Sequence, residues 1–170
     1  MSRGVPAGDR AAVLPLRGLP HRVEVRVAPL GRSRVVRSDS TIWVLMAPAE
    51  RRRPEQLLGA WLRAEARRVI VARVAQLAER HRFRYGRIFV RAQKSRWGSC
   101  SSRGNLSFNF RLILAPPEIL DYVILHELAH LRVPDHSPRF WRLVETLCPD
   151  YRSRRRWLRL RERRLMDLAL

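Results

Sequence analysis

The chain has 170 residues, 46% of them hydrophobic, which fits one compact domain with a buried core rather than a disordered protein. No apolar run approaches the roughly 18–20 residues of a membrane span, so we expect no membrane partner. The two cysteines are too few for a disulfide framework, and the first residues have no sustained apolar core of a secretory signal. We therefore expect a cytoplasmic protein with reduced thiols.

The net charge is extreme, with 35 basic against 15 acidic residues and a formal charge of +20. Lys94 is the only lysine, and a genome rich in arginine codons would explain that ratio. Codon bias does not explain the excess of base over acid. A field this positive attracts polyanions, so nucleic acid or another polyanion is a possible partner through the arginine-rich surface, and a solvated basic face is the alternative.

The hydrophobic pattern divides the chain into four segments. Residues 1–20 are rich in proline and small residues, and we expect a disordered leader. Residues 21–52 alternate apolar and polar side chains, which predicts an N-terminal antiparallel β meander. Residues 54–83 have apolar spacings of three and four, which predicts one long amphipathic helix. With a catalytic core over 87–170, residues 21–170 would form a single domain.

Within the core segment, residues 87–93 and 106–114 alternate again and predict two adjacent strands joined by a structured turn. Prolines then mark the starts of two helices, at Pro117 and Pro138. A final basic helix is predicted over 151–167.

The stretch HELAHLRVPDH carries the chemistry. His126 and His130 are four residues apart, so on a helix both imidazoles face one point, as a tetrahedral zinc ion requires. Glu127 is rotated by about 100° from His126 and can reach a zinc-bound water as its general base. The alternative is a buried helix whose histidines hydrogen-bond internally, but so apolar a helix offers them no evident partners.

A catalytic zinc needs a third protein ligand and an open fourth position. Pro134 ends the helix, and His136 can return toward the ion from the segment beyond it. We therefore predict one Zn²⁺ per chain on His126, His130 and His136. Cys100 is a conceivable fourth ligand, but a closed site would forfeit catalysis.

Residues 96–141, RWGSCSSRGNLSFNFRLILAPPEILDYVILHELAHLRVPDHSPRFW, closely resemble the YgjP-like metallopeptidase domain family, a relative of WLM and SprT-like zincins. The resemblance implies a zincin-like α+β fold, in which a small antiparallel sheet packs on an active-site helix carrying HExxH and further helices follow. It also implies zinc on the three histidines, Glu127 as catalytic base, and a zinc-dependent peptidase.

In zincins an edge strand near the active-site helix commonly holds an extended peptide by strand addition. Residues 106–110 are the candidate here, with Ser107 and Asn109 on the polar face. The hydroxyl of Tyr122 or Tyr151 could stabilise an oxyanion, although each residue could equally be structural. Glu145 is a candidate to orient a zinc-bound imidazole.

Three functions fit these residues. The first is a zinc-dependent metallopeptidase that acts on a peptide or protein substrate through Glu127 and a zinc-bound water. The alternative is a metal-dependent nucleoside-triphosphate hydrolase, because arginines bind phosphates through bidentate contacts. A second alternative is a basic nucleic-acid-binding module with a structural zinc.

Overall fold

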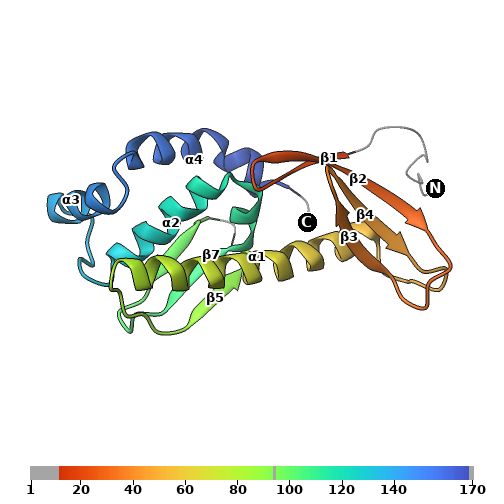
Figure 1. The fold of residues 1–170 in the computed structure, drawn as a ribbon, viewed down its shortest axis with the longest axis horizontal. Helices are drawn as coiled ribbons and strands as arrows, with labels where there is room; N and C mark the ends of the chain where they lie inside the picture. The colour runs from red at the N-terminus through yellow and green to blue at the C-terminus, as the bar shows by residue number, and fades with distance from the viewer. Residues whose placement is uncertain (1–11, 94, 169–170) are drawn as a thin grey trace.

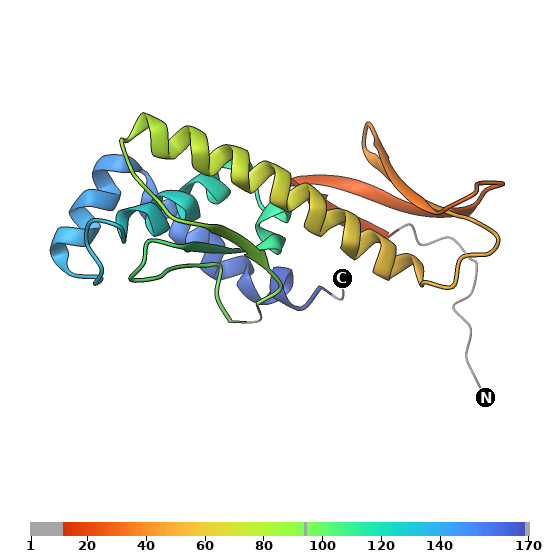
Figure 2. The same ribbon diagram turned by 90° about the horizontal axis from the view of Figure 1, so that it is seen from below.

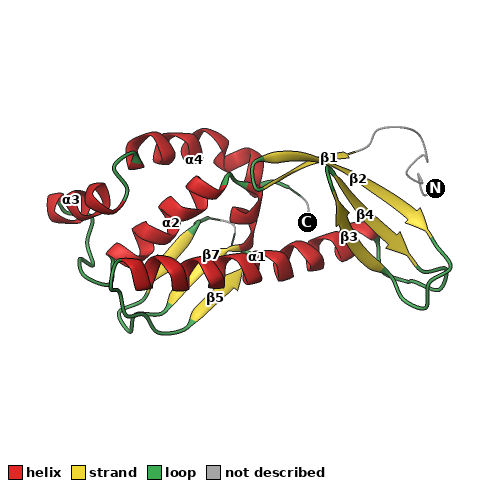
Figure 3. Cartoon of the chain, in the orientation of Figure 1, coloured by secondary structure: helices red, strands yellow, loops and turns green. Residues whose placement is uncertain are grey.

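The computed structural model describes residues 12–93 and 95–168 and has an α+β fold of two small sheets and four α-helices (Figures 1 and 3). The strands are β1 (Ala12–Leu16), β2 (Leu19–Val27), β3 (Arg34–Ser38), β4 (Thr41–Met46), β5 (Ile88–Arg91), β6 (Gly98–Cys100) and β7 (Leu106–Asn109). The helices are α1 (Pro54–Arg80), the 3₁₀ helix η1 (Phe110–Leu114), α2 (Pro117–Ala129), α3 (Pro138–Leu147) and α4 (Tyr151–Met166).

The N-terminal sheet has the strand order β1-β2-β4-β3, and β2 runs parallel to β4. The predicted antiparallel meander over 21–52 is therefore wrong in its topology. In the β3–β4 hairpin, β4 is the more buried of the two strands. It lies inside the sheet next to β2, and β3 forms the edge of the sheet. In this register Val23 lies opposite Ile42 and Val25 opposite Val44, which places the apolar residues on one face.

The predicted leader over 1–20 is also wrong for the residues that can be described, because Ala12–Leu16 and Leu19–Val27 form a β-hairpin; residues 1–11 lie outside the described part. Arg17 and Gly18 have φ values of 53° and 79°, as a tight two-residue hairpin turn requires. Their amides donate to the carbonyls of Ile113 and Leu114 in η1, at 2.7 and 3.1 Å. Tertiary contact with η1 thus holds a segment whose composition predicted disorder.

Helix α1 confirms the long helix predicted over 54–83 and runs from the N-terminal sheet along the rest of the molecule (Figures 1 and 2). Pro54 occupies its first turn, and the Gln56 side chain accepts from the Arg53 amide at 3.1 Å. The helix buries one stripe of residues at spacings of three and four: Leu58, Leu62, Ala66, Ile70, Val74 and Leu77.

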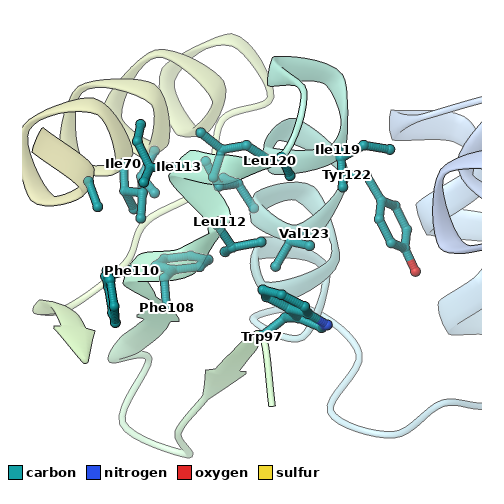
Figure 4. Packing of buried hydrophobic residues seen from close by; sticks show 14 of the residues in the cluster. Ile70, Trp97, Phe108, Phe110, Leu112, Ile113, Ile119, Leu120, Tyr122 and Val123 are labelled. Carbon is teal, nitrogen blue, oxygen red and sulfur yellow. The ribbon is translucent and has the colours of Figure 1, made fainter. Parts of the chain in front are cut away.

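The second sheet has the order β5-β7-β6, with β5 parallel and β6 antiparallel to the central β7. It is a mixed sheet rather than the small antiparallel sheet predicted to pack on the active-site helix. The strand predicted over 106–114 ends at Asn109, whose side chain accepts from the Arg111 amide at 3.1 Å and so starts η1. The apolar side chains of β7, η1 and α2 then form the core shown in Figure 4.

Helix α2 lies between α1 and the C-terminal helices and is buried on most of its surface (Figure 1). Arg73 of α1 and Asp121 of α2 form a bidentate ion pair, with N–O distances of 2.6 and 2.8 Å. This pair ties the helix that carries HExxH to the longest element of the fold. Across residues 12–93 and 95–168, no helix combines the length and the apolar character that crossing a bilayer demands.

Candidate metal centre

The final turn of α2 carries the first two histidines and the glutamate of the HExxH stretch. His126 and Glu127 lie in this turn, and His130 is the residue that caps the helix. The chain then turns through Pro134 and places His136 just before α3. Two imidazoles thus come from a rigid helical turn and the third from the segment beyond its end.

The three histidines lie together, as the sequence predicts. One ring nitrogen from each of His126, His130 and His136 lies within 4.8 Å of the other two. Nε2 of His126 is 3.2 Å from Nε2 of His136, and the rings of His130 and His136 are 4.6 Å apart and nearly perpendicular. These residues are the one group of this kind in the described ranges 12–93 and 95–168.

The chemistry of these nitrogens fits a divalent metal ion. Nδ1 of His130 is 3.2 Å from the Val133 carbonyl, and donating a hydrogen bond there leaves its Nε2 unprotonated to bind a metal. Burial lowers the pKa of His126 to about 3, with smaller effects from the charges of His130, His136 and Arg155. Burial also lowers the pKa of His130. Neutral imidazoles are the form that a metal requires.

Phe140 and Trp141 of α3 hold the third histidine against α2. The Phe140 side chain is fully buried and stacks on His130 with a centroid distance of 4.4 Å. Its ring also contacts His126 and His136 at 4.9 and 4.8 Å. Trp141 stacks on His136 at 5.8 Å. Within residues 12–93 and 95–168, this aromatic packing fixes the three imidazoles relative to one another without any hydrogen bond to a carboxylate.

Glu127 is buried, with 5% of its surface exposed, and lies against β6. A Cβ built on Gly98 would be 2.6 Å from Oε1 of Glu127, so the carboxylate occupies the space that a side chain would fill. Burial raises the pKa of Glu127 to about 8, and the nearby charge of Arg96 opposes the shift. A buried carboxyl with a raised pKa, next in sequence to His126, is a candidate for proton transfer.

The predicted peptide-binding strand is not at the sheet edge. β7, which contains Ser107 and Asn109, is the central strand, and β6 is the edge strand that contacts α2. The Asn109 side chain is fully buried and donates to the carbonyls of Gln93 and Arg96 at 2.7 and 3.2 Å. Ser107 is half-buried, and its hydroxyl oxygen has no partner in the described part of the chain. Asn109 therefore supports the loop before β6 rather than facing a cleft.

The two tyrosines contact different rings of the aromatic packing around the histidine cluster. Tyr122 is one turn before His126, with its ring edge toward that imidazole at 6.0 Å, and its hydroxyl points away from the core cluster (Figure 4). Burial raises the pKa of Tyr122 to about 12. Tyr151 stacks on Trp141 at 5.5 Å, and its hydroxyl accepts from Nε of Arg152 at 3.2 Å.

Two further candidates lie outside the cluster. The Glu145 carboxylate forms an exposed ion pair with Arg152 at 3.4 Å, and within the described part of the chain it makes no hydrogen bond to an imidazole, so the structure does not bear out its candidate orienting role. The group that hydrogen-bonds to a candidate ligand imidazole is instead the Val133 carbonyl, which is 3.2 Å from Nδ1 of His130. Cys100 is a free, half-buried thiol on β6 and is absent from the metal-ligating group.

Gly98 and Arg155 are the residues of this region that the sequence reasoning missed. Gly98 lies within the turn predicted between residues 87–93 and 106–114, and a glycine in a turn carries no signal that a carboxylate packs against it. The guanidinium carbon of Arg155 lies 4.7 Å above the Trp141 ring, which itself stacks on His136. No periodicity could distinguish this arginine from the others in the final helix.

A histidine cluster at the end of a buried HExxH helix in an α+β fold defines the class of metal-dependent peptidases. The chain matches the YgjP-like metallopeptidase domain family over residues 8–161 and belongs to that family, which confirms the resemblance seen in its sequence. No curated protein matches the chain. Among solved structures, the metallopeptidase zymogen of Methanocaldococcus jannaschii, jannalysin, is similar at 21% identity and a TM-score of 0.42, over 49% of this chain and 90% of that chain.

Family membership makes the protein a metallopeptidase, and hence a metal-dependent hydrolase with a peptide or protein substrate. It also implies a divalent metal, for which the three clustered imidazoles are suitable ligands. The comparisons give no support to a nucleic-acid partner, which had been inferred from charge alone.

Proposed function

We propose that the protein is a zinc-dependent metallopeptidase in which His126, His130 and His136 hold one Zn²⁺ per chain and Glu127 is the general base. The observation that carries this proposal is the convergence of one nitrogen from each of three imidazoles within 4.8 Å, with the buried carboxylate of Glu127 next in sequence to the first of them. Three histidine ligands with one open position are typical of catalytic rather than structural zinc.

The chemistry divides between the ion and the side chains. When bound, zinc supplies Lewis acidity, which polarises a carbonyl and lowers the pKa of water toward roughly 7. Glu127 accepts the proton from the attacking water and then delivers it to the leaving amine nitrogen. Its burial, with 5% of its surface exposed, keeps bulk water from competing for that proton. Tyr122, whose ring edge meets His126, is the tyrosine better situated to donate to the oxyanion.

We assign the extended substrate to the outer edge of β6. One edge of β6 pairs with β7, and the other has no strand partner in the described part of the chain. Strand addition there would bring a peptide backbone past Gly98, next to the Glu127 carboxylate. This replaces the earlier candidate of residues 106–110 with the neighbouring strand.

The test is a panel of casein, unstructured peptides and nucleoside triphosphates with wild-type protein, Glu127→Gln and the control Glu79→Gln, an exposed glutamate of α1. We expect peptide cleavage by wild type and Glu79→Gln, and a loss of about 10²–10⁴-fold in Glu127→Gln with its zinc content unchanged. Phosphate or pyrophosphate release without any peptide cleavage would establish the alternative nucleoside-triphosphate hydrolase. A cytoplasmic location remains a prediction from the cysteine content.

A further inference from the structure

The first half of α4 presents a stripe of arginines beside the histidine cluster. Arg152, Arg155, Arg156 and Arg159 are spaced by three and four residues and so share one helix face. Together with Tyr151 they line a surface basin of about 400 Å³. Positive charge is thus gathered at one position of a surface that is basic overall.

Most charge in this basin is not neutralised within the protein. In residues 12–93 and 95–168, no carboxylate lies within ion-pair distance of Arg155, Arg156 or Arg159, and only Arg152 has an exposed pair, with Glu145 at 3.4 Å. By contrast, the adjacent Arg154 pairs with Asp150 at 2.9 Å and donates to a backbone carbonyl. The basin arginines are therefore available to an external anion.

Direct ring contacts connect the basin to the histidine cluster. Arg155 lies on Trp141 at 4.7 Å, and Trp141 stacks in turn on His136 at 5.8 Å. Tyr151, which lines the basin, stacks on the same indole at 5.5 Å. The Trp141 indole thus separates the Arg155 guanidinium from the His136 ring. An extended peptide advances about 3.3 Å per residue, so a side chain about three residues from the scissile bond spans the distance from the histidine cluster to Arg155.

The stacking also prepares Arg155 for binding. A guanidinium held on an aromatic face loses little conformational entropy when it binds, and its planar fork matches the two oxygens of a carboxylate. We propose that the arginine basin of α4 binds a carboxylate of the peptide substrate, so that the enzyme selects peptides with an acidic side chain or a free C-terminus a few residues from the cleaved bond. This inference rests on the proposed peptidase function and adds its substrate class.

The test measures binding rather than turnover. Zinc-loaded Glu127→Gln protein is titrated with fluorescein-labelled ten-residue peptides, one with a single glutamate at a scanned position and one with glutamine there, at about 150 mM salt. A third peptide has an amidated C-terminus, and ATP serves as a competing phosphate ligand. We expect the glutamate peptide, or the peptide with a free C-terminus, to bind about tenfold more tightly than its neutral counterpart.

Two double variants isolate the basin from the general field. Arg155→Gln/Arg159→Gln should reduce the acid-to-neutral ratio to near one, while Arg67→Gln/Arg84→Gln removes the same charge elsewhere and should preserve it. The single variant Arg159→Gln, which leaves Trp141 untouched, should reduce the ratio in part. An equal loss in both doubles, no acid preference at any position, or ATP binding through these arginines without acid preference would overturn the inference. Because no turnover is needed, absence of peptide cleavage by wild type would count against the proposed function separately.

Discussion

Gly98 and Glu127 lie in such close contact that a methyl group on Gly98 would approach the carboxylate oxygen Oε1 to 2.6 Å. The edge strand β6 and the helix α2 therefore meet at a position where one partner has no side chain. The position of the Glu127 carboxylate depends on a residue that contributes no chemical group of its own.

Gly98→Ala should displace the Glu127 side chain and reduce peptide cleavage by about 10²-fold, because a shift of about 1 Å in a catalytic group has that effect. Zinc content should be unchanged, since the candidate ligands are the three histidines and the nearest atoms to the added methyl belong to Glu127. The matched control is Gly31→Ala, where nothing lies within 4 Å of the added methyl. Steady-state kinetics together with metal analysis would check this. Full activity in Gly98→Ala would show that the close contact with Gly98 does not position Glu127 for catalysis.

His136→Ala should abolish stoichiometric zinc binding while leaving the apo-protein's stability almost unchanged, because this histidine is exposed and outside the helices. Dialysis followed by metal analysis measures the first effect and urea unfolding the second. His81→Ala removes a histidine far along the chain from the cluster and should keep its zinc. Retention of one tightly bound zinc by His136→Ala would exclude it as a ligand.

Phe140→Ala should lower the free energy of unfolding by about 3–5 kcal/mol and also weaken zinc binding, because the ring is fully buried and contacts all three imidazoles. Phe108→Ala, equally buried on β7, should cost similar stability without changing zinc affinity in the protein that remains folded. Urea unfolding and a competitive zinc titration separate the two effects. Equal zinc affinities would mean that Phe140 serves packing alone.

Arg73→Ala should destabilise the protein by about 1 kcal/mol, because its bidentate pair with Asp121 joins α1 to α2 and is only partly exposed. The exposed pair of Arg68 with Glu65 within α1 provides the comparison, and Arg68→Ala should cost about 0.3 kcal/mol. Both losses should shrink at 1 M salt. Urea unfolding at two salt concentrations measures both losses of stability. A larger loss for Arg68→Ala than for Arg73→Ala would contradict the view that the Arg73–Asp121 pair is the more stabilising one.

The sequence was most informative where local chemistry determines structure. Proline and acidic residues in the first turn, followed by apolar spacings of three and four, predicted α1 within a few residues of its observed ends. Pro134 predicted that the helix would end before His136; α2 in fact ends already at Ala129, and His136 lies beyond it near its two partners. Such signals lie within a few residues of the structure that they predict.

The sequence was least informative where distant segments meet. Leu14 and Leu16 are buried in a hairpin whose turn donates two hydrogen bonds to η1, and nothing near them in sequence indicates that contact. The parallel pairing of β2 with β4 and the central position of β7 likewise depend on strand order, which alternation cannot reveal. The sequence suggested that residues 106–110 form an edge strand, but β7 is central and β6 is the edge strand beside α2. The proposed peptide site therefore lies at Gly98 instead of Ser107.

X-ray absorption at the zinc edge of the loaded wild-type protein tests the central claim most directly. The account predicts three histidine nitrogens and one solvent oxygen at ~2.0–2.1 Å, with one ion per chain. Scattering from sulfur at ~2.3 Å would instead indicate Cys100 and a closed site. Fewer than three imidazoles around the ion, or protein that takes up no zinc, would contradict the proposed metal centre.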